Sequence, residues 1–487
     1  MMRGLSCTKM VIAGVAIILL ILTGMPQQSS ASSEALVCLD CHRQKNVHTN
    51  EGVAASRMFC ISCHGKLESS LRGSGKQAVS LAVPEASFQG NPHQHVACVQ
   101  CHTDVARSPH QTDTGAQCRA CHTVHGEGPA HAPHLRVDCQ ACHYTHANVV
   151  FDATGNRIML ASIVAGQTSN QPAAGRVDHA LQDLTGEQSC RRCHHAQNTV
   201  GAPASALPAK SVLCITCHPS PLAVGHPMFW LAGSILMAGL FLMLRFWFIG
   251  SVQGEAKSLH RKISLTSEAV WSSLFSRKLL TVLKTLAVDI LLQRRILKES
   301  VQRWSMHSLI FIAILARFAL SIFTGMLFSI NPDGDLALAL IDKNHPVTAF
   351  TYDFLGLLLL TGILWAAIQR FVLKPVHSLS EIKDNITLGL IGALVMVGFL
   401  TAAARILLSG VPANIAIYSF MGYPLSRALA VLPLDWRVVY PWLWYAHAII
   451  GAAFIAYLPF GKLKHIFTVP MTYFLEEVYG AKKTDRV

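Results

Sequence analysis

The stretch CLDCH at residues 38–42 is the first of seven copies of the pattern C-x-x-C-H, and these copies decide how the first half of the chain folds. Two thiols and a following histidine are the attachment signature of c-type haem, in which both sulfurs form thioethers and the histidine binds the iron. The cysteines of the copies are Cys38, Cys41, Cys60, Cys63, Cys98, Cys101, Cys118, Cys121, Cys139, Cys142, Cys190, Cys193, Cys214 and Cys217. The histidines that follow them are His42, His64, His102, His122, His143, His194 and His218. The sequence therefore predicts seven covalently bound haem c groups.

Two simpler explanations of a C-x-x-C pair are a zinc site and a disulfide or thiol redox pair. Zinc sites would combine the pairs two by two, and seven pairs would leave one over. Neither explanation requires a histidine directly after the second cysteine. The copies use fourteen of the fifteen cysteines, and only Cys7 lies outside them. Covalent haem accounts for all of these features.

Residues 35–225 are predicted to form a loop-rich, haem-packed multihaem cytochrome c domain, because so short a segment around seven porphyrins cannot build an ordinary core. Each iron needs a second axial ligand, and bis-histidine ligation favours electron transfer over substrate chemistry. The favoured distal ligands are His95, His125, His146 and His179. Other histidines outside the copies are His48, His93, His110, His131, His134, His195 and His226. For each of them a solvated loop histidine is the alternative.

Residues 1–31 have the features of a secretory signal peptide, namely basic Arg3 and Lys9, an apolar run over 10–23 and a small-residue cleavage site at 29–31. A retained membrane anchor is the alternative. Export agrees with the haem chemistry, since c-type haem is attached on the outer side of the cytoplasmic membrane. We therefore expect a multi-pass protein of the bacterial inner membrane whose haem c domain lies in the periplasm.

The second half, residues 226–475, is predicted to be an all-α membrane bundle of five transmembrane helices. The apolar runs are 227–249, 305–330, 349–372, 386–408 and 440–460, and each is long enough to cross a bilayer. Basic residues concentrate in segment 250–303, near 370–385 and in the tail 476–487, which places these parts in the cytoplasm. The net charge of +13 is therefore a topology signal, and no nucleic-acid partner is expected. Residues 278–297 have the pattern of an amphipathic helix on the inner membrane surface.

Polar side chains inside membrane spans are costly, so they are candidates for function. His307 lies at the cytoplasmic start of span two, and His447 lies near the outer end of span five. His465 follows 18 residues after His447. On one α-helix that spacing is five turns and about 27 Å, which would place both imidazoles on one face near opposite membrane surfaces. The pattern predicts one or two b-type haems, each held by a second histidine from another helix.

The same half resembles a known family of membrane cytochromes. The residues that carry the resemblance are Arg303–His307, Tyr352–Gly356, Ala404–Ile406, His447 and Leu458–His465. They are similar to the membrane cytochrome b subunit (gamma subunit) of respiratory nitrate reductase, and to its relatives in heterodisulfide-reductase-like complexes. The resemblance covers about 226–475. It implies quinone chemistry near a b haem, although no motif in the sequence fixes a quinone site.

The resemblance also implies ligands for the b haems. The inner haem of that family is held by the first histidine of span two and the last histidine of span five, which are His307 and His465 by position. The outer haem uses a histidine ten residues further along span two, where this chain has Arg317. His447 then has no obvious partner, and the alternatives are a pairing with His345 or His226, or a role toward quinone. Arg317 is a candidate partner for a haem propionate or for a salt bridge.

These features together predict a protein that exchanges electrons between menaquinol and periplasmic c-type cytochromes. Electron flow in the reverse direction, toward quinone or a cytoplasmic iron–sulfur partner, is the nearest alternative. A second alternative is a binding module, a tethered multihaem cytochrome that serves as a subunit of a larger complex and whose membrane half holds no b haem. A third is a haem-handling protein of cytochrome assembly, which the seven covalent sites and the lack of a dense tryptophan motif disfavour. Partner identity and oligomeric state are not encoded in any motif.

Overall fold

The computed structural model describes residues 50–65, 70–71, 79–80, 83, 91–102, 118–122, 134–144, 149–160, 181, 190–251, 258–276, 278–373 and 382–479. The predicted signal peptide at 1–31, the first C-x-x-C-H copy and the end of the tail lie outside these residues. The chain forms two units. The first comprises Met1–Gln117 with Asp178–Leu181, and the second comprises Cys118–Val177 with Gln182–Val487.

The described part of the first unit contains two short helices and one small hairpin. Helix α3 (Asn50–His64) carries the second C-x-x-C-H copy in its last turns, and α4 (Cys98–Cys101) is the third copy itself. Strands β1 (Ser70–Leu71) and β2 (Val79–Ser80) pair antiparallel. The Arg57 side chain donates to the Gln94 carbonyl, which ties α3 to the turn before α4. This local bond holds two neighbouring copies close together.

The haem-motif part of the second unit is also built from short elements. It contains η3 (Cys118–Ala120), α5 (Cys139–His143) and η5 (Val212–Thr216), which begin or end within C-x-x-C-H copies. Strands β3 (Val149–Asp152) and β4 (Arg157–Leu160) form an antiparallel hairpin whose turn includes Asn156 at positive φ. The Asp152 carboxylate accepts from the backbone N–H groups of Thr154 and Gly155 and closes the turn. The described helices and strands of this part are therefore all short.

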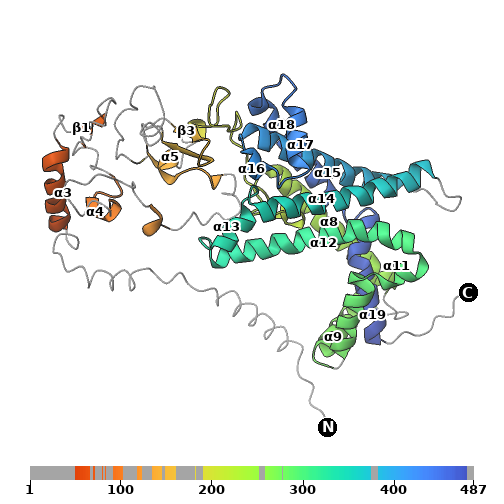
Figure 1. The fold of residues 1–487 in the computed structure, drawn as a ribbon. Coiled ribbons are helices and arrows are strands. Elements are labelled where there is room, and N and C mark those ends of the chain that lie inside the picture. Colours follow the sequence, from red (N-terminus) through yellow and green to blue (C-terminus); the bar gives the residue numbers. More distant parts are fainter. Residues whose placement is uncertain are drawn as a thin grey trace, which may run out of the picture. The chain divides into compact units, whose positions relative to one another are not determined.

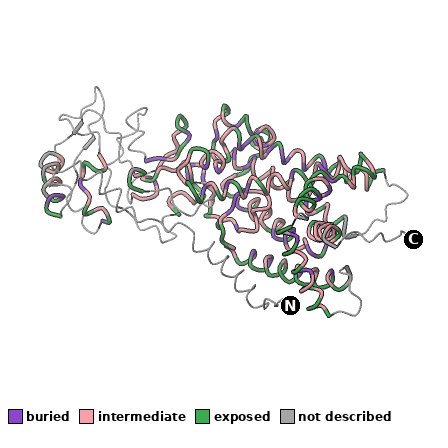
Figure 2. The backbone as a smooth tube through the Cα atoms, turned by 90° about the horizontal axis from the view of Figure 1, so that it is seen from below, coloured by how far each residue is buried: buried purple, intermediate pink, exposed green. Residues whose placement is uncertain are grey.

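Five helices long and apolar enough to cross a membrane confirm the predicted bundle (Figure 1). They are α8 (Pro227–Ser251), α12 (Val301–Ile330), α14 (Pro346–Ala367) with the π-turn η7 (Ile368–Val372), α15 (Ile382–Leu408) and α18 (Trp436–Tyr457). The outer faces carry large apolar side chains such as Phe241 and Trp442, as expected of helices surrounded by lipid. Figure 2 shows that the buried residues of these helices lie inside the bundle.

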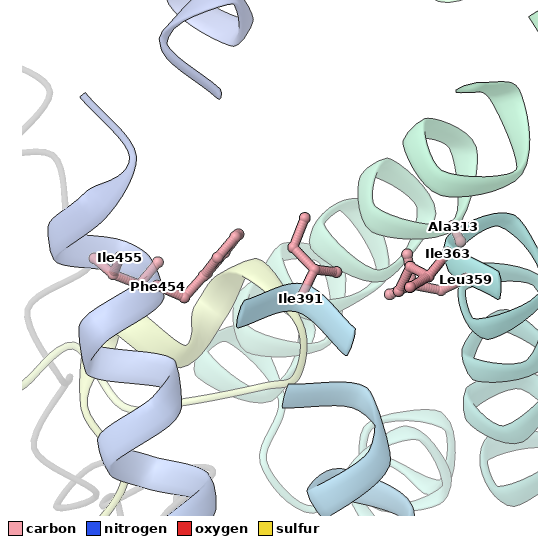
Figure 3. Packing of buried hydrophobic residues seen from close by; sticks show 6 residues of the cluster. All are labelled: Ala313, Leu359, Ile363, Ile391, Phe454 and Ile455. Atoms are coloured by element: carbon pink, nitrogen blue, oxygen red, sulfur yellow. The ribbon is translucent and has the colours of Figure 1, made fainter. Parts of the chain in front are cut away.

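The five helices of the bundle pack against one another in series. Helix α12 packs on α14, α14 on α15, α15 on α18, and α18 on α8. Figure 3 shows the central cluster that these contacts build. Its buried members are Ala313, Leu359, Ile363, Ile391, Phe454 and Ile455. Gly362 permits the close approach of α14 to α12, since a Cβ there would lie 2.7 Å from a side-chain carbon of Ile310.

Span five ends earlier than the sequence suggests. Helix α18 ends at Tyr457, the 3₁₀ turn η8 (Lys462–Lys464) follows, and α19 (His465–Tyr479) starts a new helix. Pro459 has no N–H to continue the helical ladder, and the residue before a proline disfavours helix. The prediction that His447 and His465 project from one straight helix is therefore wrong. His465 instead opens the first turn of α19.

Several shorter helices flank the bundle. One group, α9 (Leu259–Leu274), α10 (Lys278–Thr285), the π-turn η6 (Leu286–Leu291) and α11 (Arg294–Glu299), follows α8. The single amphipathic helix predicted for 278–297 is interrupted because Gln293 adopts positive φ between η6 and α11. Helices α9 and α10 pack against α19. The sequence between the spans also forms α13 (Asp335–Ile341), α16 (Ala413–Ala416) and α17 (Gly422–Leu429).

Candidate haem ligation sites

Two predicted b-haem ligands, His307 and His465, lie face to face. His307 is in the second turn of α12, and His465 is the first residue of α19. Their ring centroids are 6.0 Å apart. A metal-bound imidazole nitrogen lies about 2.0 Å from the metal and about 1.1 Å from its ring centre, so two axial rings on one iron have centres about 6 Å apart. The separation of the two rings therefore fits a bis-histidine haem site.

Both imidazoles are oriented by a hydrogen bond at their Nδ1 atom. His307 Nδ1 lies 2.9 Å from Gln293 Oε1, and His465 Nδ1 lies 2.7 Å from the Lys462 carbonyl oxygen. These oxygens accept, so each Nδ1 donates its proton and each Nε2 keeps a lone pair. Histidine ligands of metals are commonly held by such a second hydrogen bond. The tautomer that iron requires is thus set by the protein.

Gln293 is a residue that the sequence did not single out. Its left-handed backbone ends the π-turn η6 and turns its side chain toward α12, where Oε1 also accepts from Ser308 Oγ at 3.2 Å. The Trp304 indole donates to the Leu292 carbonyl at 3.0 Å and fixes the same loop against α12. A glutamine between two helical segments has no feature in a single sequence that marks it as functional. Only the packing of the loop identifies its function.

Replacing Gln293 by asparagine is expected to weaken haem b binding about 10–100-fold, as loss of an outer-shell partner does at other metal sites. The shorter amide no longer reaches His307, whereas asparagine still tolerates the left-handed backbone. Haem b retention during detergent dilution measures the effect. Gln302→Asn on the exposed face of α12 is the matched control. Equal haem b retention in both variants would contradict the assigned function.

The other predicted ligand, His447, faces the histidine of the seventh copy. The ring centroids of His218 and His447 are 6.5 Å apart, and the rings are inclined by 30°. Gly398 on α15 leaves room for the His447 ring, because a Cβ there would lie 3.2 Å from its Cε1. Of the alternatives considered from sequence, His226 instead lies beside Tyr445, with ring centroids 6.4 Å apart.

Basic side chains gather around this second pair. His218 lies within electrostatic reach of Lys210 and Arg317, and Lys210 within reach of Arg405. Burial lowers the pKa of Lys210 to about 8, and Arg405 adds to the shift. Arg317 donates to the Tyr352 carbonyl, while its buried Nε has no hydrogen-bond partner. Basic groups therefore outnumber acidic ones around the pair, where Asp353 is the carboxylate within reach of Arg317.

A third histidine pair lies in the haem-motif part of the second unit. The rings of His194, from the sixth copy, and His134 are 6.3 Å apart between centroids. His194 Nδ1 donates to the Pro203 carbonyl at 3.0 Å, which again leaves Nε2 for a metal. His134 was among the sequence candidates but was not favoured. Of the favoured ones, His95 lies exposed in the turn before α4, and His125, His146 and His179 lie outside the described residues.

Thiols of successive copies also approach one another. None of the eleven motif cysteines whose side chains are described takes part in a disulfide. Burial raises the pKa of the Cys98 thiol to about 11, and a hydrogen bond with Cys60 of the preceding copy contributes. Burial likewise raises the pKa of the Cys142 thiol to about 11, with Cys193 of the next copy adding to it. Thiols of successive copies thus lie close to one another in these two places.

Comparison with known proteins supports the assignment of the membrane half. Residues 331–483 match the family described as nitrate reductase gamma subunit. The membrane half is similar to that subunit. The matched region includes His447 and His465, whereas His307 precedes it. A membrane electron-transfer subunit that holds haem b fits this likeness.

Curated relatives support the same assignment. The chain is 31% identical over 195 residues to one subunit of the dihydromethanophenazine:CoB–CoM heterodisulfide reductase of Methanosarcina thermophila, and 32% identical over 200 residues to its counterpart in Methanosarcina barkeri. Each match covers 39% of this chain, and 64% and 65% of the two relatives. The chain thus spans slightly less than two thirds of the relatives' length. No solved structure gives a significant match.

A mostly apolar cavity of about 350 Å³ lies between the end of α8, the flanking helices and α19. Its lining includes Trp247, Val270, Ile290 and Phe474. The polar side chains in its lining are Thr266, Thr285 and Glu477, and Thr285 Oγ1 donates to Glu477 Oε1 at 3.0 Å. An apolar cavity with a few polar groups is the common form of a small-molecule site.

Proposed function

We propose that the protein is an inner-membrane cytochrome b/c that exchanges electrons between menaquinol and periplasmic c-type cytochromes in anaerobic respiration. The observation that carries the proposal is the His307–His465 pair, which has the separation of two axial ligands and lies in an apolar helical bundle. The same chain continues without interruption from this bundle into repeated haem-attachment motifs. A redox centre in the membrane and a series of centres outside it form one electron path.

The proposed cofactors are seven haem c groups and one haem b. The haem c groups are attached at the seven C-x-x-C-H copies, and the haem b is held by His307 and His465. Bound haem supplies one-electron redox chemistry, and bis-histidine ligation leaves no open position on the iron. The chain's own residues fix the imidazole tautomers, exclude water from the bundle and keep neighbouring attachment points close. These are the requirements of electron transfer rather than of small-molecule conversion.

Menaquinol is the proposed electron donor, and three observations support it. The likeness to membrane subunits of redox complexes favours a membrane-soluble reactant. The cavity beside α19 has the apolar lining that an isoprenoid quinone requires, and Glu477 and Thr285 supply polar groups at its edge. Helix α19 begins with His465, so the cavity and the proposed haem b ligand share one helix. Soluble periplasmic cytochromes are the proposed acceptors.

A second candidate function is that of an electron-transfer subunit in a larger complex with a cytoplasmic iron–sulfur partner. The curated relatives are each named as one subunit of a heterodisulfide reductase. The segment from α9 to α11 is also exposed and basic, with Arg261 and Lys298 among its outer side chains. In that case electrons pass between the periplasmic haems and the cytoplasmic partner through the same membrane site.

Purified protein is expected to contain seven haem c and one haem b, and a menaquinol analogue is expected to reduce both types under anaerobic conditions. The count follows from the seven motifs and the single intramembrane pair made by two non-motif histidines among the described residues. A pyridine haemochrome assay separates and counts the two haem types, and stopped-flow spectroscopy follows their reduction. Seven haem c without any haem b would reject the proposal and leave a tethered cytochrome.

A further inference from the structure

We propose that His447, on the transmembrane helix α18, is the distal axial ligand of the haem attached at the seventh C-x-x-C-H copy. His218 is then the proximal ligand of the same iron. This haem would be covalent, like the other haem c groups, and yet belong to the membrane bundle. The inference rests on the proposed function, because it assumes that Cys214 and Cys217 carry haem.

The first argument is the separation of the two rings. The His218–His447 centroid distance of 6.5 Å is close to the 6.0 Å of His307 and His465 and to the 6.3 Å of His194 and His134. All three distances agree with the separation of about 6 Å that one iron imposes on two axial imidazoles. The ring atoms of His218 and His447 include a buried Nδ1 without a hydrogen-bond partner in each case. A buried ring nitrogen without a partner is costly unless a bound group supplies one.

The second argument is the position of the seventh copy. The 3₁₀ helix η5, which contains Cys214, packs against α12 and α18. Leu213 contacts the central cluster of the bundle, and Cys214 packs on the cluster formed by Phe229, Ala232 and Ala452. Arg317 of α12 lies within electrostatic reach of Cys217. The attachment point of the seventh haem is thus built into the bundle rather than joined to it by a free loop.

The third argument is charge. Lys210, Lys343 and Arg317 lie within electrostatic reach of His218, Asp353 is the carboxylate within reach of Arg317, and Arg317 Nε is buried without a partner. A haem brings two propionates, and basic side chains pair with carboxylates by charge-assisted hydrogen bonds. An anionic cofactor at this place would neutralise a cluster that is otherwise electrostatically unfavourable.

This assignment also explains why α12 has an arginine at position 317. In the resembling family a histidine at that place helps to hold the outer b haem, and a guanidinium has no lone pair for iron. Here the seventh motif supplies the missing imidazole, His218, from outside the helices. His447 occupies the same position on span five as the family's outer ligand, but it pairs with His218 instead of with a histidine on span two. The outer haem of the bundle then becomes a c-type haem, and only the inner haem remains b-type.

The attachment itself needs no further reactant. Each thiol, of Cys214 and of Cys217, adds across one vinyl double bond of haem, so that a sulfur–carbon bond forms and the thiol hydrogen ends on the neighbouring carbon. No net oxidation occurs, and no leaving group is released.

His307 and Arg317 are ten residues apart on α12, which is about 15 Å along the helix. The inner and outer sites are therefore stacked within one bundle.

The test uses the full-length holoprotein and its His447→Gly variant. The variant is expected to keep seven haem c and one haem b, because the thioethers hold the seventh haem without its distal ligand. One haem in eight is expected to change from low spin to high spin, as measured by electron paramagnetic resonance and by carbon monoxide binding to the reduced protein. Added imidazole is expected to restore the low-spin state. His226→Ala, which removes a nearby outer histidine, is the matched control and should show no change.

Two outcomes would overturn the inference. One is two haem b groups in the wild type with one lost in the variant, which would place a non-covalent haem at His447. The other is an unchanged spin state, which would leave His447 without iron. His447→Met, which fills the space better, guards against misfolding of the glycine variant and should give the near-infrared band of a methionine-ligated haem. Mass spectrometry of the peptide that contains Cys214 and Cys217 distinguishes failure of this inference from failure of the proposed function. Free thiols in that peptide would show that the seventh copy carries no covalent haem.

Discussion

Replacing His307 by alanine is expected to remove haem b completely while the seven haem c groups remain. Haem b has no covalent bond to the chain, so its retention depends on the two axial ligands and on packing. His307 and His465 supply both ligands from separate helices, and neither α12 nor α19 has another histidine among its described residues. The same loss is expected for His465→Ala. The b-type band of the pyridine haemochrome spectrum measures the effect.

The functional consequence of the substitution is equally large. Without the inner haem, a menaquinol analogue is expected to reduce the haem c groups no faster than in a sample without quinol. His260→Ala is the matched control, because His260 is an exposed histidine on the flanking helix α9. The control should keep haem b and rapid reduction. A His307→Ala protein that retains haem b would show that another pair of residues holds it.

Replacing Cys214 and Cys217 together by serine is expected to block electron transfer from the membrane half to the other haem c groups. The seventh copy packs against α12 and α18, so the haem there is the proposed connection between the two haem types. The variant should keep haem b and six haem c. A quinol analogue should still reduce haem b rapidly, whereas the remaining haem c groups should stay oxidised on the same timescale.

The matched control removes a different haem by the same chemistry. Cys98→Ser with Cys101→Ser deletes the third copy, which belongs to the first unit. That variant also loses one haem c, but its first transfer step from haem b should keep the wild-type rate. Stopped-flow spectroscopy at the separate b and c bands distinguishes the two variants. Equal rates of haem c reduction in the two variants would show that the seventh haem is not the connection between haem b and the other haem c groups.

Local sequence was sufficient for the parts of the fold that depend on chemical type and spacing. The C-x-x-C-H copies can be recognised in a short stretch of sequence, because attachment of one haem needs two thiols and a histidine within five residues. The five spans are local because lipid requires a continuous apolar helix, and all five appear in the structure. His307 and His465 were also named from the sequence as candidate ligands, and the structure places their ring centroids 6.0 Å apart.

Other features were not readable from the sequence, because they depend on residues far apart in it. Gln293 reaches His307 only through a left-handed turn between η6 and α11, which the helical pattern of 278–297 conceals. His134 is one of many loop histidines, and only the fold brings it to His194. The break after Tyr457 was visible as Pro459 and Gly461, yet the spacing of two histidines favoured one straight helix instead.

The sequence by itself thus predicted the kinds of site, their number and the membrane spans, because each of these is written in a short run of residues. The tertiary structure decided which histidines meet. His218 and His447 are separated by more than two hundred residues, and their pairing follows from the packing of η5 between α12 and α18. An axial ligand pair is defined by one distance across an iron, and a distance between remote residues is fixed only when the helices that carry them are packed.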